Sequence, residues 1–298
     1  MRGTRTLAAA LALCAAAVAG CGLGPGKDEG DVQLTISRDF GHTVMEHTTD
    51  SIKESDDVLR VLDRNAEITT RYGGRFVQSI DGLAGGESGG RRTDWFFYVN
   101  GIESPVGGAD YDLSDGDRIW WDHHDWTSAM RVPAVVGSWP EPFVHGFRKD
   151  RWPAAVDCRT SAPVCGKVSV VLRTAGADLS GGGSPIQVEV GPWDRIESVG
   201  SVDLLAKPPS ESGVYANFSG DRRSLLNLLN ERGEISGSLG HGAGLVAALR
   251  SGDGPPTWVV TGTDKAGVMA AARLVGPSLT NHFAVATDGG QPIPVPVP

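Results

Sequence analysis

Apolar and polar residues alternate along 32–38 (VQLTISR), the pattern of a strand with one buried face. By the same pattern and by β-propensity, we expect further strands at 42–52, 76–80, 95–99 and 118–124. Apolar residues at helical spacing follow Ser55, Asp56 and Asp57, which can cap a helix beginning at residue 58. The first half therefore predicts strand, strand, helix and then three strands.

The second half alternates strand and helix patterns. We expect strands at 168–172, 186–190, 214–218, 245–250, 257–261 and 283–286, and helices at 194–206 and after Thr263 or Asp264. Residues 225–229 fit either a helix or a strand. The predicted fold class is α+β, with a small β-grasp-like mixed sheet and one helix, followed by a mixed α/β domain.

The N-terminus has the features of a secretion signal. Arg2 and Arg5 precede an uncharged, alanine- and leucine-rich run over 7–19 that is too short to span a bilayer permanently. The run ends in Val-Ala-Gly-Cys at 18–21, which resembles the lipobox of bacterial lipoproteins. That resemblance implies removal of 1–20, a lipid on Cys21 and a membrane partner, with the chain held outside the cytoplasmic membrane. The alternative is a plain signal peptide that contains Cys21 by chance.

Composition refines this organisation. The 298 residues include 41 glycines and 18 prolines, which predict many turns and linkers. We expect a tether at 21–31, a first domain at 32–127, a Pro- and Trp-rich strap at 128–166, an α/β domain at 167–290 and a Pro-rich tail at 291–298, serving as a spacer or docking strip. The net charge of −9 argues against nucleic acid as a partner.

Two cysteines remain beyond the signal and the lipidation site. Cys158 and Cys165 are separated by six residues, and an extracytoplasmic location favours a disulfide between them. A zinc site would need two more ligands nearby, and redox pairs usually have two intervening residues.

Three motifs of the first half resemble the transcobalamin C-terminal-like domain. They are DWFFYVNG at 94–101, GADY at 108–111 and LSDGD at 113–117, within a resemblance over roughly 32–126. The resemblance implies a β-grasp fold whose exposed turns meet a ligand or a partner protein. Transcobalamin holds its corrinoid against a large helical domain, which this sequence lacks, so cobalamin binding does not simply carry over.

Aromatic side chains are the main candidates for ligand binding. Six of the eight tryptophans lie between Trp95 and Trp152, and strand alternation places Trp120, His124 and Trp126 on one face. Such a platform suits sugars, corrinoids, quaternary ammonium groups or a protein. The candidate ligand-binding residues are Trp95, Asn100, Trp120, His124 and Trp126. Alternatively, Trp139, Trp152 and the neighbouring prolines cover this face and make it an inter-domain core.

Other motifs give weaker signals. His123 and His124 are adjacent on a strand and point to opposite faces, so we predict no metal site there. Residues 242–247 (GAGLVA) fit a loose dinucleotide pattern, but a turn into a strand explains them better. Residues 261–264 (TGTD) could bind an anion, although an ordinary helix cap is favoured. No catalytic constellation or cofactor motif is apparent.

The leading functional hypothesis is a non-enzymatic, membrane-anchored binding or accessory module, for example in uptake of a vitamin or corrinoid-like molecule through a membrane transport partner. The alternatives are an envelope protein-interaction scaffold and an extracytoplasmic hydrolase. A scaffold predicts a flat exposed apolar patch, whereas a hydrolase requires a cleft with two carboxylates or a serine bonded to a histidine.

Overall fold

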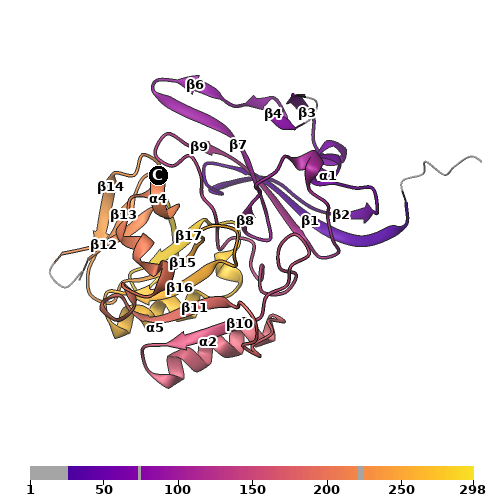
Figure 1. Ribbon diagram of the computed structural model, residues 1–298. Helices are drawn as coiled ribbons and strands as arrows, with labels where there is room; N and C mark the ends of the chain where they lie inside the picture. Colours follow the sequence, from indigo (N-terminus) through magenta and orange to yellow (C-terminus); the bar gives the residue numbers. More distant parts are fainter. Residues whose placement is uncertain (1–25, 73–74, 221–224) are drawn as a thin grey trace, which may run out of the picture.

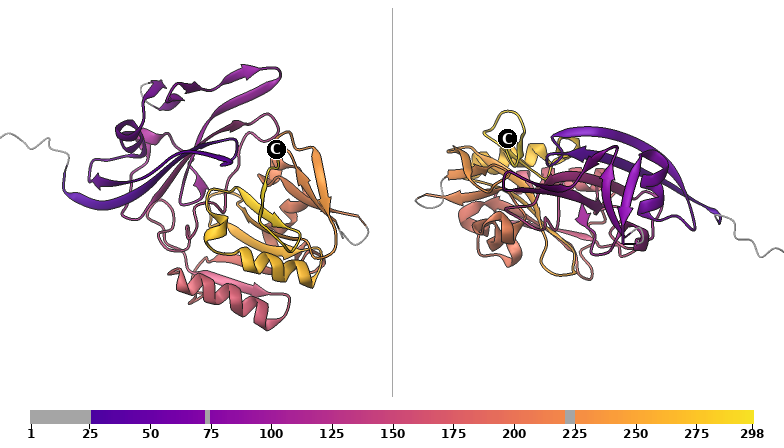
Figure 2. Two further views of the ribbon diagram at one scale, coloured as in Figure 1. Left: turned by 180° about the vertical axis from the view of Figure 1, so that it is seen from behind. Right: turned by 90° about the horizontal axis from the view of Figure 1, so that it is seen from above.

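Two mixed β-sheets organise the computed structural model, which describes residues 26–72, 75–220 and 225–298 (Figure 1). The first sheet is built from the N-terminal part of the chain and the second from the C-terminal part. Seen from above, the two parts lie side by side (Figure 2). The chain is thus mixed α/β and rich in sheet, as its sequence pattern predicts.

The first sheet has the strand order β2-β1-β9-β7-β6, with β8 paired to β7. Its strands are β1 (Asp28–Arg38), β2 (Thr43–Lys53), β6 (Gly86–Ser88), β7 (Arg91–Val99), β8 (Ile102–Glu103) and β9 (Arg118–Asp125). β1 and β9 pair in parallel, whereas the other pairs are antiparallel. The five strands predicted in this part are all present, the third as β4 (Phe76–Ile80) outside this sheet.

Helix α1 (Val58–Asn65) covers one face of this sheet. Asp57 caps it by accepting a hydrogen bond from Arg60 N at 2.8 Å, as the sequence predicts. Its buried Val58, Val61 and Leu62 pack with the inward residues of the strands, including Leu34. β4 pairs with β3 (Ile68–Arg71) and β5 (Leu83–Ala84) in a small separate sheet, and η1 (Gly108–Asp110) precedes β9.

The second sheet has the order β10-β11-β16-β15-β17-β18, and its first three strands are parallel neighbours. The strands are β10 (Ala154–Cys158), β11 (Ile186–Pro192), β15 (Gly244–Leu249), β16 (Thr257–Gly262), β17 (Ala284–Thr287) and β18 (Ile293–Val295). Helices α2 (Ala162–Thr174) and α5 (Lys265–Leu274) pack on one face of it (Figure 1).

The opposite face carries short helical turns and a third sheet. The turns are α3 (Trp193–Ile196), η2 (Gly200–Ala206) and α4 (Pro209–Ser212), and η4 (Pro277–Leu279) follows α5. The third sheet has the order β12-β13-β14, formed by β12 (Ala216–Ser219), β13 (Leu225–Leu229) and β14 (Ile235–Leu239). Residues 225–229 are therefore a strand, and the helix predicted over 194–206 is divided between α3 and η2.

Four expectations about element types and boundaries differ from the structure. Residues 168–172 lie in α2 rather than in a strand, because the buried Val164, Val168 and Leu172 recur every four residues, which is a helical spacing. The tail at 291–298 is not a free spacer, since β18 pairs with β17 and Val295 is buried. The second sheet also begins earlier than residue 167, because β10 belongs to it, and Asp28–Asp31 of the predicted tether are already strand.

Candidate functional site

The aromatic face of β9 is the core between the two parts of the chain. Trp120 and His124 are each only 2% exposed. Their rings lie 5.3 and 5.4 Å from the ring of Phe283, which belongs to the second part. The inter-domain alternative is therefore correct, although its covering residues are Phe283 and Tyr215. Trp139 packs elsewhere, in the core beneath α2 and α5, and the partly buried Trp152 packs against that core and against the core beneath α1.

A buried carboxylate organises this core. Asp122 accepts hydrogen bonds from Ser37 Oγ at 2.5 Å, Phe40 N at 3.0 Å, Gly41 N at 2.8 Å and His124 Nδ1 at 2.8 Å. Trp120 Nε1 in turn donates to Ser37 Oγ at 2.7 Å. The His124 ring stacks between Phe40 and Phe96, each at a centroid distance of 4.5 Å. The polar groups of this layer thus bond to one another and hold the β1–β2 turn on β9.

This cluster contains a serine, a histidine and an aspartate, but its bonding is not that of a nucleophilic triad. Ser37 Oγ and His124 Nδ1 each bond to Asp122, so the imidazole does not accept the serine proton. Asp122 and Ser37 are fully buried. The arrangement is suited to structure rather than to acyl transfer.

Trp95 and Asn100 also have structural positions. Trp95 is 5% exposed, and its Nε1 donates to Leu83 O at 2.8 Å. Asn100 is fully buried at φ 53°, and its Nδ2 donates to Asp117 Oδ1 and to Gly146 O, both at 2.8 Å. Four of the five predicted ligand-binding residues are therefore buried in the protein, whereas Trp126 lines an open cavity.

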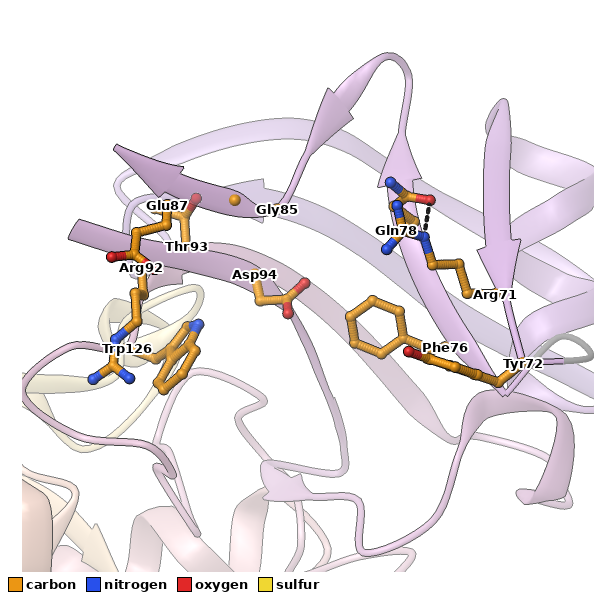
Figure 3. A pocket seen from close by; sticks show the side chains of 11 residues that line it. Arg71, Tyr72, Phe76, Gln78, Gly85, Glu87, Arg92, Thr93, Asp94 and Trp126 are labelled. Carbon is orange, nitrogen blue, oxygen red and sulfur yellow. Dashed lines mark hydrogen bonds between the residues drawn. The ribbon is translucent and has the colours of Figure 1, made fainter. Parts of the chain in front are cut away.

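That cavity is a groove of about 450 Å³ on the first part of the chain, a size suited to a small molecule (Figure 3). The β3–β4 hairpin, the β5–β6 segment, β7 and the residue after β9 each form part of its wall. Its lining residues are Arg71, Tyr72, Phe76, Gln78, Gly85, Gly86, Glu87, Arg92, Thr93, Asp94 and Trp126.

Aromatic side chains occupy two flanks of the groove, on either side of Asp94 (Figure 3). Phe76 is partly buried and Tyr72 is 81% exposed, and both lie on the flank formed by the β3–β4 hairpin. On the other flank the Arg92 guanidinium carbon lies 4.1 Å from the centroid of the Trp126 ring. One face of Trp126 is therefore already in contact with a cation.

Asp94 is the half-buried polar residue between these flanks. Its Oδ1 accepts a hydrogen bond from Trp95 N at 2.9 Å. Among the described residues no salt bridge reaches its carboxylate, and the guanidinium group of the nearby Arg92 lies over the Trp126 ring. Burial raises the pKa of Asp94 above its ordinary value, outweighing the backbone hydrogen bond and the charges of His123 and His124. Gly85 gives the side chain room, because a Cβ there would lie 2.5 Å from Asp94 Oδ1.

The remaining polar residues define the charge of the groove. Arg71 Nε donates to Gln78 Oε1 at 2.6 Å, drawn as a dashed line in Figure 3. Arg71 and Arg92 supply two positive charges, and Glu87 and Asp94 supply two negative charges. The groove thus offers donors and acceptors without a net charge of either sign.

Most of these residues were not candidates at the sequence level. Tyr72, Phe76 and Asp94 are separated by a hairpin and a glycine-rich loop, and no local spacing brings them together. The sequence does carry one signal. Tyr72 and Phe76 flank the turn of one hairpin, and a short hairpin offers aromatic side chains no buried partner of its own.

The weaker motifs have structural roles. Asp264 caps α5 through Ala266 N and Gly267 N and also accepts from Gly242 N, so a carboxylate already occupies this helix terminus. A Cβ on Gly244 would lie 2.3 Å from Gly267 O, which shows that the GAGLVA segment allows α5 to approach β15 closely.

Other sequence-level expectations have mixed outcomes. Cys158 and Cys165 form the predicted disulfide, with Cα atoms 5.8 Å apart. In the described part of the chain, no group of three or more His, Cys, Asp or Glu side chains is placed to hold a metal ion. No helix within that part is long and apolar enough to cross a membrane. Cys21 and the signal segment lie outside the described residues.

Several solved structures match part of this chain, two of which follow. A Ruminococcus gnavus protein described as a candidate metal binding protein has 14% identity and a TM-score of 0.25, covering 33% of this chain and 98% of its own. Haptocorrin in complex with Cbi has 17% identity and a TM-score of 0.25, covering 32% of this chain and 26% of its own. The chain thus spans about a quarter of the haptocorrin chain. Similarities this low carry no argument about function.

Comparison with families gives one match, and it falls within the first part of the chain. No curated protein matches the sequence. Residues 55–125, which run from just before the Asp57 cap of α1 to the end of β9, match the family model described as Domain of unknown function (DUF4430).

Proposed function

We propose that this chain is a lipid-anchored, extracytoplasmic binding protein whose groove at Asp94 takes a small ligand without transforming it. The observation that carries this proposal is the half-buried Asp94 carboxylate, free of salt bridges among the described residues, between two aromatic flanks. The groove is open to solvent, so the carboxylate lone pairs that no protein group uses are available to a hydrogen-bond donor on a ligand.

The location outside the cell is supported by two features. The segment 1–21 has the charge, length and cysteine of a lipoprotein signal. The Cys158–Cys165 disulfide suits an oxidising compartment.

We include a β-grasp arrangement of the first sheet in the proposal. It is supported by the parallel pair β1–β9, which lies between antiparallel neighbours.

The non-enzymatic character is supported by the bonding at the two polar clusters. The Ser37, Asp122 and His124 cluster is buried, and Ser37 Oγ and His124 Nδ1 both bond to the Asp122 carboxylate. In the groove, Glu87 lies on an exposed three-residue strand, so its position relative to Asp94 is less fixed than paired catalytic carboxylates require.

Lipid anchoring is tested by feeding cells labelled palmitate and isolating the full chain. We expect label in the wild type and in Cys14→Ser, and none in Cys21→Ser, which should be released from the membrane fraction. Label that persists in Cys21→Ser, or a wild type without label, would overturn the anchoring.

Ligand binding is tested with the full chain in detergent, using calorimetry against neutral sugars, charged sugars, cobinamide, quaternary amines and short peptides. We expect one class to bind, with affinity reduced by Asp94→Asn, and to be recovered chemically unchanged. If a class binds and is cleaved, the chain is an enzyme. If no class binds, the groove is not a ligand site and the scaffold alternative gains support.

A further inference from the structure

The groove at Asp94 has a composition that selects among chemical classes of ligand. We infer that its ligand is a neutral, polyhydroxylated molecule, namely an uncharged saccharide. This inference rests on the proposed function, because it names the ligand class of the same groove. Three features each favour it: the charge balance of the lining, the division of the aromatic flanks, and the carboxylate lone pairs of Asp94 that face the groove rather than a protein donor.

The charges of the lining residues argue against an ionic ligand. Two arginines, Arg71 and Arg92, are matched by two carboxylates, Glu87 and Asp94. An anion would meet the half-buried Asp94 carboxylate, and a cation would meet a groove with an arginine on each flank, so either ion is opposed by a like charge. A hydroxyl group donates to a carboxylate and accepts from a guanidinium, and it satisfies both signs without carrying charge.

The arrangement of the aromatic side chains argues against two further classes of ligand, quaternary ammonium groups and corrin rings. A quaternary ammonium group needs several open ring faces around one point, but Arg92 already covers one face of Trp126 at 4.1 Å. A corrin ring needs one continuous apolar surface, whereas Asp94 separates the Trp126 flank from the Tyr72 and Phe76 flank (Figure 3). Sugar rings present apolar C–H faces edged by hydroxyl groups, which fits aromatic flanks on either side of a carboxylate.

Substitutions of Tyr72 and Asp94 test the inference most directly. Tyr72 is 81% exposed, so Tyr72→Ala removes a stacking face without disturbing the core. Tyr72→Phe retains the ring and is its matched control. Asp94→Asn preserves an oxygen that can accept from Trp95 N while removing the charge. Asp63→Asn, on the exposed side of α1, controls for loss of a carboxylate.

The experiment measures dissociation constants of the full chain for a panel of neutral and charged oligosaccharides, cobinamide and short peptides, at low and high salt. We expect a neutral oligosaccharide to bind with little salt dependence, because neither partner contributes net charge. We expect weakening of about 10-fold or more in Asp94→Asn and about 5-fold in Tyr72→Ala, a smaller loss in Tyr72→Phe, which retains the ring, and near wild-type binding in Asp63→Asn.

The experiment distinguishes failure of the saccharide inference from failure of the proposed binding function. If only a charged sugar, cobinamide or a peptide binds and Asp94→Asn weakens it, the saccharide inference is overturned while the groove remains a binding site. If a neutral saccharide binds but none of the groove variants affects it, the site lies elsewhere and both proposals fail. Both also fail if no member of the panel binds.

Discussion

His124 Nδ1 donates to Asp122 Oδ1 at 2.8 Å, and both side chains are almost fully enclosed between the two parts of the chain. The pair lies on the face of β9 that the sequence presents as a row of aromatic and histidine residues. Its enclosure explains why this row is a junction and not a ligand platform.

Asp122→Ala should strongly destabilise the protein. The carboxylate accepts from Ser37 Oγ, Phe40 N, Gly41 N and His124 Nδ1, and its removal leaves buried donors without acceptors. We expect the free energy of unfolding to fall by about 3–5 kcal/mol in urea titrations followed by circular dichroism. The exposed control Asp63→Ala should change it by less than about 0.5 kcal/mol. A similar small change in Asp122→Ala would contradict the structural role given to Asp122.

Asp117 should make stability depend on pH. Burial raises its pKa to about 6 from an ordinary value of 3.8, with a smaller contribution from Glu141, and hydrogen bonds from Ser114 N and Asn100 oppose the rise. The native state therefore binds this proton more tightly than the unfolded state. The resulting stabilisation is complete below about pH 4 and is lost as the pH rises through 6.

The measurement for Asp117 is the free energy of unfolding between pH 4 and pH 7.5 in wild type and Asp117→Asn. The wild type should lose about 2–3 kcal/mol more than the variant over this interval. Parallel pH profiles for the two proteins would show that Asp117 titrates normally. Asp63→Asn should follow the wild-type profile.

Gly267→Ala should destabilise the protein although alanine favours helices. Gly267 lies in α5, and a Cβ there would be 1.9 Å from Ala243 O, so the helix would have to move away from the sheet. We expect a loss of at least about 2 kcal/mol in thermal or urea unfolding. Gly166→Ala in α2 is the matched control, because a Cβ there meets no atom within 4 Å. It should gain about 0.5–1 kcal/mol from helix propensity. Equal effects at the two glycines would refute the close approach of α5.

Loss of the disulfide should moderately lower the free energy of unfolding. The Cys158–Cys165 bond closes a short loop between β10 and α2. The chain-entropy relation for a loop of this size gives about 2–2.5 kcal/mol. We expect this loss in the double variant Cys158→Ser, Cys165→Ser. Dithiothreitol should lower the unfolding free energy of the wild type and leave that of the double variant unchanged. If reductant lowers both equally, the disulfide is not the source of the effect.

The local sequence pattern was sufficient to predict much of the fold. Alternation placed β1 and β9, and the acidic residues before Val58 placed the cap of α1 at Asp57, because both signals depend on neighbours a few residues away. The disulfide followed from compartment and spacing. The strand predicted at 168–172 was wrong because β-branched valines masked the four-residue spacing of α2.

The site depended on contacts between distant segments. The sequence determined that Trp120 and His124 share a face of β9, since strand geometry alternates side chains. Only the tertiary structure decided that Phe283, more than 150 residues later, covers this face, leaving Trp126 to line the groove. The groove unites Tyr72 after β3, Asp94 within β7 and Trp126 after β9, and these side chains line one cavity only when the three segments meet.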